Sequence, residues 1–441
     1  MFWRPRWPAW SALRGRRGFQ LVLLSLATAC AFFARTSLGP LQETMRVALT
    51  LNDNQMALLQ GPPLALGVIA TIPLGILIDS RPRIRLLWVF ALLALLVDGL
   101  AAAASNMTVL FCLRCLAGLS AATVFTTVLS LLSDWYPPDQ RGRATMVVGV
   151  GAAAGLSGAF ALGGFLLRLM APSANSWRWA MLGFAGPLVV GLLAIWAMQE
   201  PARTGFNAND SSPRQMYAAL WRYRATMLPL TLGFALVAGI ADGAALIWAA
   251  PALSRAFRLT PDRVGGIMAT VLLVNGLLAP FLGGVLADLS QRAGGPYRTA
   301  TLLSGLLLLG IPSGFFALSA GVATAAVELI VFLVSGSAFQ VAAFALTTII
   351  LPNELRGSCL ALMQGVAYLF AFGVAPLLVS HLSVALGGEG MIGKSLAVIC
   401  ATCSLGGAVS FWLGRHTFRG LGAHGPGAQG LQGYAASRPC E

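Results

Sequence analysis

The sequence predicts an all-α membrane protein with twelve transmembrane helices in two pseudo-symmetric six-helix halves. Its composition is 57% hydrophobic and only 10% charged, whereas a typical soluble domain carries about 25% charged residues. The hydrophobic residues gather in runs of about 20, the length of helix that crosses a hydrocarbon core of about 30 Å. Loop motifs of the first half also return in the second half, which indicates an internal repeat.

The hydrophobic runs define twelve expected spans, and the longest polar gap divides them into two groups of six. This gap, 199–225, is rich in Pro, Asn, Asp and Ser, so we expect it to link a first half at 19–198 to a second half at 226–414. Tails at 1–18 and 415–441 complete the chain. The spans are expected at 19–40, 56–78, 86–105, 107–133, 144–168, 178–198, 226–250, 264–287, 299–319, 322–350, 358–382 and 392–414.

Basic residues are distributed unevenly between the two sides of this topology. With the N-terminus inside, the cytoplasmic segments hold twenty arginines and the outer segments hold seven basic residues. This excess predicts that both termini are cytoplasmic. Only one of the 29 basic residues is a lysine, a bias typical of GC-rich bacterial genomes, so we expect a bacterial inner membrane. The net charge of +14 comes from scattered arginines without interleaved aromatic residues, so we expect no nucleic-acid partner.

Two loop motifs recur at nearly the same offset. Gly75-Ile-Leu-Ile-Asp79 returns as Gly284-Val-Leu-Ala-Asp288, an offset of 209 residues from 79 to 288. The segment 138–142 returns as 353–357, an offset of 215 residues from Arg141 to Arg356. Parallel halves of this kind place a solute site near the midplane between them.

Four motifs of the first half carry a family resemblance. They resemble the motifs of the major facilitator superfamily, and the resemblance covers nearly the whole chain apart from the tails. It implies the major facilitator fold and a transport function. The motifs are the loop from Gly75 to Arg85, the Arg-x-x-x-Gly pattern at Arg114 and Gly118, Trp177-Arg178-Trp179, and Glu200-Pro201.

Three further stretches resemble the anion:cation symporter and spinster branches of that superfamily. They are Ala-Arg-Thr-Ser-Leu-Gly-Pro at 34–40, Asp-Trp-Tyr-Pro at 134–137, and Gly163-Gly164. Those branches typically carry acidic residues implicated in proton coupling at the positions that match Ala34 and Ala121. The coupling that the resemblance implies therefore has no carboxylate at its usual positions.

Two arginines inside predicted spans are the main candidates for substrate binding. A charge within a span costs about 2.5–3.5 kcal/mol, so it persists where it faces a cavity or a partner. Arg35 and Arg114 lie roughly 8 and 11 Å below the outer ends of spans one and four. The resemblance implies that these spans line the cavity, where two guanidinium groups suit a carboxylate or phosphate; an internal ion pair is the alternative. Trp248, Gln340 and Gln364 complete the predicted substrate-binding set, with core packing or interhelical hydrogen bonds as their alternative.

Two acids of the second half are the predicted proton-coupling residues. Asp242 on span seven and Glu328 on span ten lie almost where the repeat offsets map the two arginines. Protonation of either acid would release an arginine to the substrate anion. Asp98 lies in span three, which the fold places at the periphery, and we expect it to pair locally.

The repeated loops supply the predicted gating residues. The resemblance implies that Asp79 faces the start of span eleven near Arg356, a contact that favours the outward-open state; a plain turn-and-cap role is the alternative. The predicted gating set is Asp79, Arg83, Arg141, Asp288 and Arg356.

These features predict a secondary active transporter that moves a small organic solute, expected to be an anion, by alternating access. Proton coupling is left open, and we expect a monomer whose partners are the solute and the lipid bilayer. Export of an amphipathic or lipid-like compound and a non-transporting membrane sensor are the alternatives. The sequence has no phosphate-binding glycine loop, zinc-ligand spacing or nucleophile–base arrangement, so it predicts no enzyme, no cofactor and no metal site.

Overall fold

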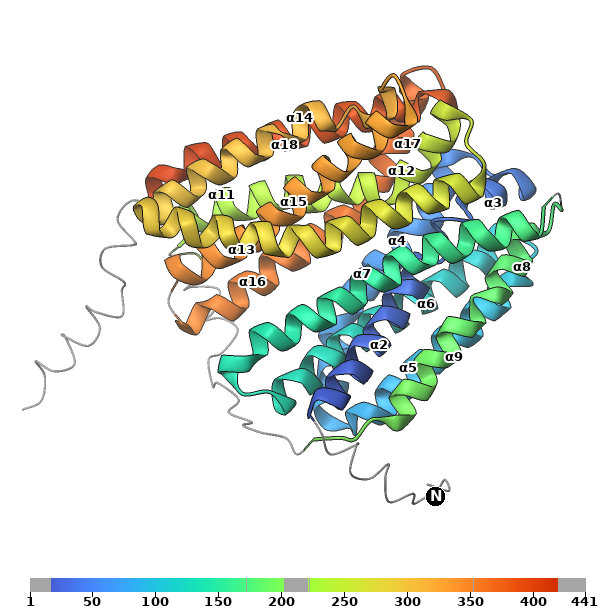
Figure 1. Ribbon diagram of the computed structural model, residues 1–441, viewed down its shortest axis with the longest axis horizontal. Coiled ribbons are helices and arrows are strands. Elements are labelled where there is room, and N and C mark those ends of the chain that lie inside the picture. Colours follow the sequence, from blue (N-terminus) through green and yellow to red (C-terminus); the bar gives the residue numbers. More distant parts are fainter. Residues whose placement is uncertain (1–16, 172, 202–220, 222, 352, 419–441) are drawn as a thin grey trace, which may run out of the picture. The chain divides into compact units, whose positions relative to one another are not determined.

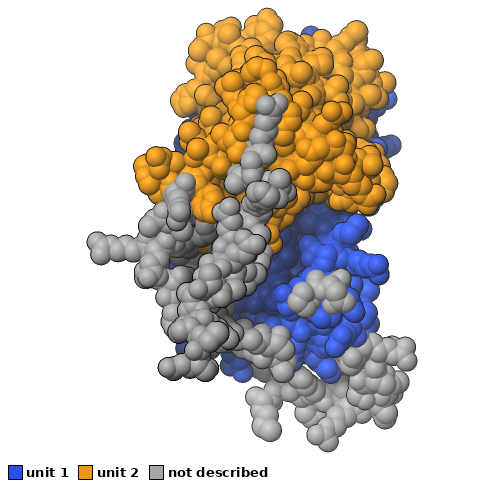
Figure 2. Space-filling model, turned by 90° about the vertical axis from the view of Figure 1, so that its left-hand side faces the viewer, with its two compact units in different colours: residues 1–207, 249–277 blue, residues 208–248, 278–441 orange. Residues whose placement is uncertain are grey.

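The computed structural model describes residues 17–171, 173–201, 221, 223–351 and 353–418, and these contain helices and turns but no strand (Figure 1). The predicted tails, apart from 17–18 and 415–418, and the linker segment 202–220 lie outside the described residues. Contacts divide the chain into two compact units (Figure 2). Unit 1 comprises residues 1–207 and 249–277, and unit 2 comprises residues 208–248 and 278–441.

Each predicted span lies mostly on helix within the described residues, and turns occupy some of the span ends, such as 37–40. Ten helical segments there are long and hydrophobic enough to cross a membrane. One of them, Pro261–Leu318, covers two predicted spans, because Gly294 and Gly295 interrupt it with non-helical backbone. The φ of 67° at Gly295 is one that glycine adopts without steric cost. The predicted second span lies on a separate helix of 28 residues, Asp53–Ser80.

Unit 1 is built from long helices that pack closely at small residues. A Cβ added to Gly163 would lie 2.6 Å from the ring of Pro40, and one added to Gly118 would lie 2.8 Å from the Pro63 carbonyl carbon. Glycine therefore permits the close approach of α4 and α6 at Gly118, and of α7 and the turn after α2 at Gly163. The helices are α2 (Arg17–Thr36), α3 (Gln42–Ala48), α4 (Asp53–Ser80), α5 (Arg83–Ala102), α6 (Met107–Trp135), α7 (Pro138–Leu169), α8 (Ser176–Gly183) and α9 (Ala185–Ala197).

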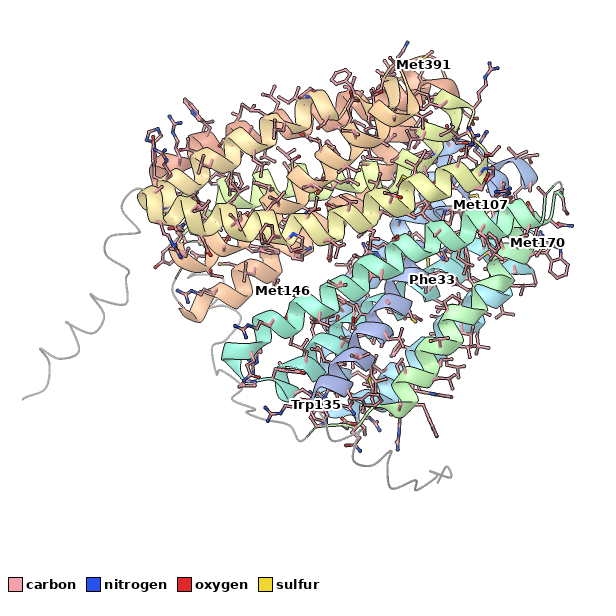
Figure 3. All side chains as sticks on the ribbon, viewed as in Figure 1. Phe33, Met107, Trp135, Met146, Met170 and Met391 are labelled. Atoms are coloured by element: carbon pink, nitrogen blue, oxygen red, sulfur yellow. The ribbon has the colours of Figure 1, made fainter. Side chains whose placement is uncertain are left out.

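Polar side chains fix where two of these helices begin. Asn52 and Gln55 form a capping box at the start of α4, with two hydrogen bonds of 2.9 Å. Asn106 accepts a 2.9 Å hydrogen bond from the Val109 amide and so caps α6. Figure 3 shows α6 running from Met107 to Trp135 at opposite ends of the unit.

Unit 2 contains two π-helical segments that contact each other. A Cβ added to Gly239 in the first segment would lie 3.0 Å from the carbonyl oxygen of Ala367, beside the second. π-Segments are rare and are often found at functional sites. The helices of the second half of the sequence, in chain order, are α11 (Arg224–Phe234), η1 (Ala235–Ala241), α12 (Asp242–Phe257), α13 (Pro261–Leu308), α14 (Gly310–Ser313), η2 (Phe316–Leu318), α15 (Val322–Ile350), α16 (Asn353–Tyr368), η3 (Leu369–Val374), α17 (Ala375–Ala385), η4 (Glu389–Met391), α18 (Ile392–Gly414) and η5 (Arg415–Phe418).

The end of α12 and the start of α13 belong by contact to unit 1, although the sequence places them in the second half. The Ser157 hydroxyl of α7 donates to the Ala269 carbonyl at 2.7 Å. A Cβ added to Gly164 would lie 2.9 Å from the Pro261 carbonyl oxygen. Residues 249–277 are therefore joined to the first-half helices.

Candidate functional site

Asp242 is an acidic residue within a helix of unit 2 whose carboxylate is hydrogen-bonded to another polar side chain. It follows the π-segment η1 and begins α12. Its Oδ2 accepts a 2.8 Å hydrogen bond from Gln340 Nε2 on α15. Its Oδ1 is buried and has no hydrogen-bond partner among the described residues. A carboxylate in this setting is costly while charged, and protonation removes that cost.

The absence of a side chain at Gly336 makes room for this carboxylate. A Cβ added there would lie 2.8 Å from Asp242 Oδ2, so α15 presents a glycine where the acid approaches it. Gln340 lies one helical turn further along the same face of α15. The two predicted residues Asp242 and Gln340 are therefore brought together by the fold.

Glu328, the second predicted coupling acid, lies elsewhere on α15. It is separated from Gly336 by eight residues of helix, which is about 12 Å along the axis. Its carboxylate accepts a hydrogen bond from Ser319, in the loop before the helix. Asp242 and Glu328, which the repeat offsets map almost onto the two arginines of the first half, thus bond to different side chains.

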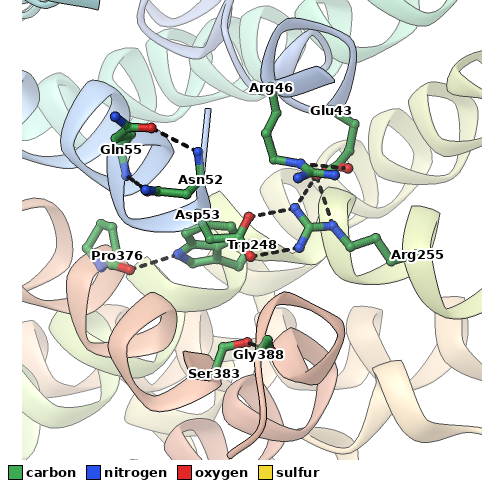
Figure 4. Close-up of polar contacts among 10 residues, drawn as sticks. All are labelled: Glu43, Arg46, Asn52, Asp53, Gln55, Trp248, Arg255, Pro376, Ser383 and Gly388. Atoms are coloured by element: carbon green, nitrogen blue, oxygen red, sulfur yellow. Dashed lines mark hydrogen bonds and ion pairs between the residues drawn. The ribbon is translucent and has the colours of Figure 1, made fainter. Parts of the chain in front are cut away.

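Two other predicted substrate residues of unit 2 differ in their exposure. Trp248 is fully buried, and its indole nitrogen donates to the Pro376 carbonyl at 3.1 Å (Figure 4). These contacts support the alternative of core packing for Trp248. Gln364 is half-buried on α16, and its role stays a prediction.

Arg114 is almost completely buried in unit 1 and is shared by three groups. Its Nη1 lies 3.5 Å from Asp98 Oδ1 on α5 and donates to the Ser37 hydroxyl at 3.2 Å. Its Nη2 donates to the backbone carbonyl of Arg35 at 3.3 Å. The local pairing expected for Asp98 is therefore present, with Arg114 as the partner. These contacts match the alternative of an internal ion pair, and they tie Arg114 to the end of α2 that carries Arg35.

Arg35 itself lies in a different environment. Its side chain is half-buried, and its guanidinium lies 5.3 Å from the centre of the Phe32 ring. A cation over an aromatic face is stabilised without losing its ability to bind an anion. The two arginines predicted to bind substrate thus lie in different environments.

A third charged cluster, which the sequence analysis did not single out, joins α12 to α3 and α4. The Arg255 guanidinium contacts Asp53 through both of its amino groups, at 2.7 and 2.8 Å, and contacts Glu43 Oε1 at 2.6 and 3.1 Å (Figure 4). Asp53 is 1% exposed. Two-pronged contacts of this kind are the strongest ion pairs that arginine makes. Sequence separations of more than 200 residues gave no local signal for this cluster.

A small pocket lies beside this cluster in unit 1. Its volume is about 30 Å³, more than the roughly 10–15 Å³ that a water needs. Gln42 and Glu43 line it together with residues of α12 and α13. Both polar side-chain atoms of Gln42 are buried without a hydrogen-bond partner among the described residues.

The predicted gating arginine Arg83 is buried within unit 1. Its Nη1 lies 2.5 Å from Asp134 Oδ2 and 3.1 Å from the Ser130 hydroxyl, both on α6. Its backbone amide donates to Glu200 at 2.7 Å. These contacts tie the ends of three first-half helices together within unit 1.

Arg141 and Arg356 repeat one geometry in the two units. Arg141 Nε donates to the Tyr136 carbonyl and Arg356 Nε donates to the Leu351 carbonyl, each at 3.0 Å. Each arginine therefore caps the end of the preceding long helix, α6 or α15, and both pairs share the offset of 215 residues. This agreement supports the internal repeat at the level of side-chain contacts. Asp288 is exposed on α13, whereas the side chain of Asp79 lies outside the described residues.

Comparison with known families decides the class of the protein. The family model of the Major Facilitator Superfamily matches residues 24–376. The chain belongs to the major facilitator superfamily. Its all-helical membrane fold and the superfamily resemblance predicted from the sequence are thereby confirmed. Members of this superfamily are carriers and not enzymes, in agreement with the sequence prediction.

The curated relatives match this carrier over part of its length only. Human solute carrier family 22 member 7 is 36% identical over 138 residues, which is 31% of this chain and 23% of the relative. The probable nitrate/nitrite transporter NarK2 of Mycobacterium tuberculosis is 28% identical over 142 residues, 32% of this chain and 35% of the relative. The matched segments thus span about a quarter to a third of these relatives.

Solved structures show the same fold over nearly the whole carrier. A bacterial homologue of the human lysosomal transporter Spinster, in an inward-facing and unoccupied conformation, superimposes with a TM-score of 0.73 at 19% identity, covering 91% of this chain and 97% of that one. A D-xylose–proton symporter gives a TM-score of 0.70 at 16% identity, covering 90% and 97%. Identities this low establish the fold alone.

Proposed function

We propose that the chain is a secondary carrier of a small organic anion, coupled to protons through Asp242, in a bacterial inner membrane with both termini cytoplasmic. The observation that carries the coupling is the Asp242 carboxylate, with one oxygen held by Gln340 and the other buried without a partner among the described residues. Protonation removes the cost of keeping this buried carboxylate charged. Gln340 can donate a hydrogen bond to the charged form through its amide NH₂ or accept one from the protonated form through its amide oxygen.

The anion is proposed from Arg35. Its guanidinium is supported by Phe32, and Arg114 fixes the backbone from which it extends. The relative NarK2 is named for two inorganic anions, which supports an anionic substrate without identifying it. Because Arg114 is neutralised by Asp98, one arginine and not two is proposed to bind the solute.

The Arg255 cluster is proposed to close the outer side of the carrier. The residues that it joins lie in α3, α4 and α12, so an outward opening that separates span seven from the first-half helices must break it. This contact replaces Arg83 as the proposed gate, since Arg83 bonds within the first-half helices.

Uptake by the purified chain in proteoliposomes tests this function. The wild-type carrier should accumulate an anion from a panel of carboxylates and nitrate when a pH gradient is applied, up to about tenfold per pH unit for one proton per solute. Asp242→Asn should retain exchange of solute for solute and lose accumulation. Glu328→Gln is the matched control and should still accumulate.

Three results would contradict parts of the proposal. Normal accumulation by Asp242→Asn would exclude this acid as the proton carrier. A wild-type protein that ignores the pH gradient would be a uniporter or an exchanger. Transport of neutral or lipid-like compounds alone would exclude the anion.

A further inference from the structure

A hydrophobic groove runs between α13 and α18 within unit 2. Its volume is about 280 Å³. Several of the side chains along it, including Leu308, Leu405, Val409 and Trp412, are 46–49% exposed. Large hydrophobic residues left open in this way on a membrane protein face lipid. The lining residues are Thr301, Ser304, Gly305 and Leu308 of α13, and Leu405, Ala408, Val409 and Trp412 of α18.

A cationic cluster lies at the end of this groove nearest the end of α18. The Arg415 guanidinium lies 4.0 Å from the centre of the Trp412 ring and 5.6 Å from that of Tyr297. The His416 ring packs edge-on against Tyr297, with 5.8 Å between ring centres. Among the described residues, no carboxylate pairs with Arg415. A cation on two aromatic rings, without a counter-ion from the described part of the chain, suits an external anion.

Trp412 belongs to both features and so joins them. Its side chain lines the hydrophobic groove, and its ring also contacts the Arg415 guanidinium. Tyr297 lies one helical turn before Thr301 on α13, so the cluster continues the groove along both helices. The combined surface offers a hydrophobic channel for a chain and a cation for an anionic head.

We propose that this surface binds an anionic membrane phospholipid, with an acyl chain in the groove and the phosphate on Arg415. Basic groups beside grooves between transmembrane helices recognise anionic headgroups in this way. The predicted orientation places Arg415 at the cytoplasmic leaflet, which carries the negative surface potential. A neutral lipid matches the groove but leaves the cation without a partner, so charge complementarity selects the anionic lipid.

Native mass spectrometry of the full chain in detergent tests the site. The protein is mixed with equal amounts of phosphatidylglycerol and phosphatidylcholine of the same acyl chains, and the lipid retained per carrier is measured. Wild type should prefer phosphatidylglycerol by about fivefold, the factor that corresponds to about 1 kcal/mol for one basic residue at the surface. Arg415→Gln should abolish the preference and Arg415→Lys should retain most of it.

A second variant fills the groove. A Cβ added at Gly305 meets nothing within 4 Å, so the helix admits a side chain there, and the ring of Gly305→Phe should reduce retention of both lipids. Arg143→Gln and Gly99→Phe are the matched controls in unit 1, because Arg143 is exposed and a Cβ at Gly99 also meets open space. Both controls should bind lipid as the wild type does.

The outcomes separate the lipid from other occupants. Unchanged phosphatidylglycerol preference in Arg415→Gln would overturn the headgroup contact, and unchanged retention in Gly305→Phe would overturn the acyl-chain contact. Equal retention of both lipids by the wild type would overturn the anionic assignment. A wild-type dimer that Gly305→Phe converts to a monomer would assign the groove to a second copy of the chain and overturn the proposal.

Discussion

Replacement of Arg255 by glutamine should open the outer side of the carrier. The guanidinium makes four nitrogen–oxygen contacts of 2.6–3.1 Å to Glu43 and Asp53, and the three side chains are 18%, 24% and 1% exposed. At an effective dielectric constant of about 20, one pair of unit charges about 4 Å apart attracts by about 4 kcal/mol. The costs of desolvation and of side-chain ordering offset part of this attraction, and the partial exposure of Arg255 and Glu43 weakens the attraction further. We therefore expect a loss of about 2 kcal/mol from the outer-closed state, which is roughly a thirtyfold shift in population.

A thiol at Gln42 reports this shift. Gln42 is 1% exposed, lines the pocket beside the cluster, and makes no side-chain hydrogen bond within the described residues, so its loss costs little. In a background without the seven native cysteines, Gln42→Cys is labelled by a membrane-impermeant maleimide added from outside. When opening is rare, the labelling rate follows the population of the open state, so Arg255→Gln should raise it by roughly tenfold to thirtyfold.

The matched control is Arg258→Gln, which removes an exposed arginine three residues further along. It should leave the labelling rate within about twofold of the parent, since an exposed charge contributes about 0–1 kcal/mol. The exchange of charges in Arg255→Glu with Glu43→Arg should restore part of the protection. An unchanged rate in Arg255→Gln, or an equal rise in Arg258→Gln, would refute the proposed outer closure.

Two further predictions concern the first unit and the topology. Arg35→Gln should raise the KM for the substrate anion at least about tenfold, the effect of losing one charged contact of about 1.5 kcal/mol or more, with normal thermal unfolding. Arg114→Gln should instead lower the unfolding temperature, because it leaves Asp98 buried and unpaired at a cost of about 3–5 kcal/mol. Adding Asp98→Asn to Arg114→Gln should recover part of that loss. Equal unfolding temperatures for Arg35→Gln and Arg114→Gln would contradict these separate roles. A cysteine at Ser173 should react with an impermeant reagent only from outside, and one at Ala293 only from the cytoplasm, as both positions are exposed; the reverse pattern would invert the topology.

The candidate site was only partly predictable. Asp242, Gln340 and Arg35 could be selected as candidates because an embedded polar group is costly and therefore conspicuous in a hydrophobic run. The same rule found Arg114 and left an internal ion pair open as its alternative, and the structure supplies Asp98 as its partner. Glu328 was selected because a repeat offset maps it almost onto Arg114, but an offset locates a residue along the chain and does not specify which neighbour it will bond.

The outer cluster could not have been found in this way. Arg255, Glu43 and Asp53 lie near helix ends, where charges are ordinary and carry no signal in the hydropathy pattern. Their significance comes from distances between atoms that are separated by more than 200 residues along the chain. The lipid groove is similar, because its two walls come from the separate helices α13 and α18.

The sequence by itself determined that this is a membrane protein, which class of fold it has, and that it contains an internal repeat. The bilayer leaves backbone polar groups no partner except one another, so long hydrophobic runs must become helices, and their lengths and flanking charges can be read in one dimension. Only the tertiary structure decided which charges are neutralised, where Asp242 meets Gln340, and that residues 249–277 pack with the first-half helices. Those outcomes depend on how helices face and cross one another, and the hydropathy of a span is nearly the same whichever neighbour it packs against.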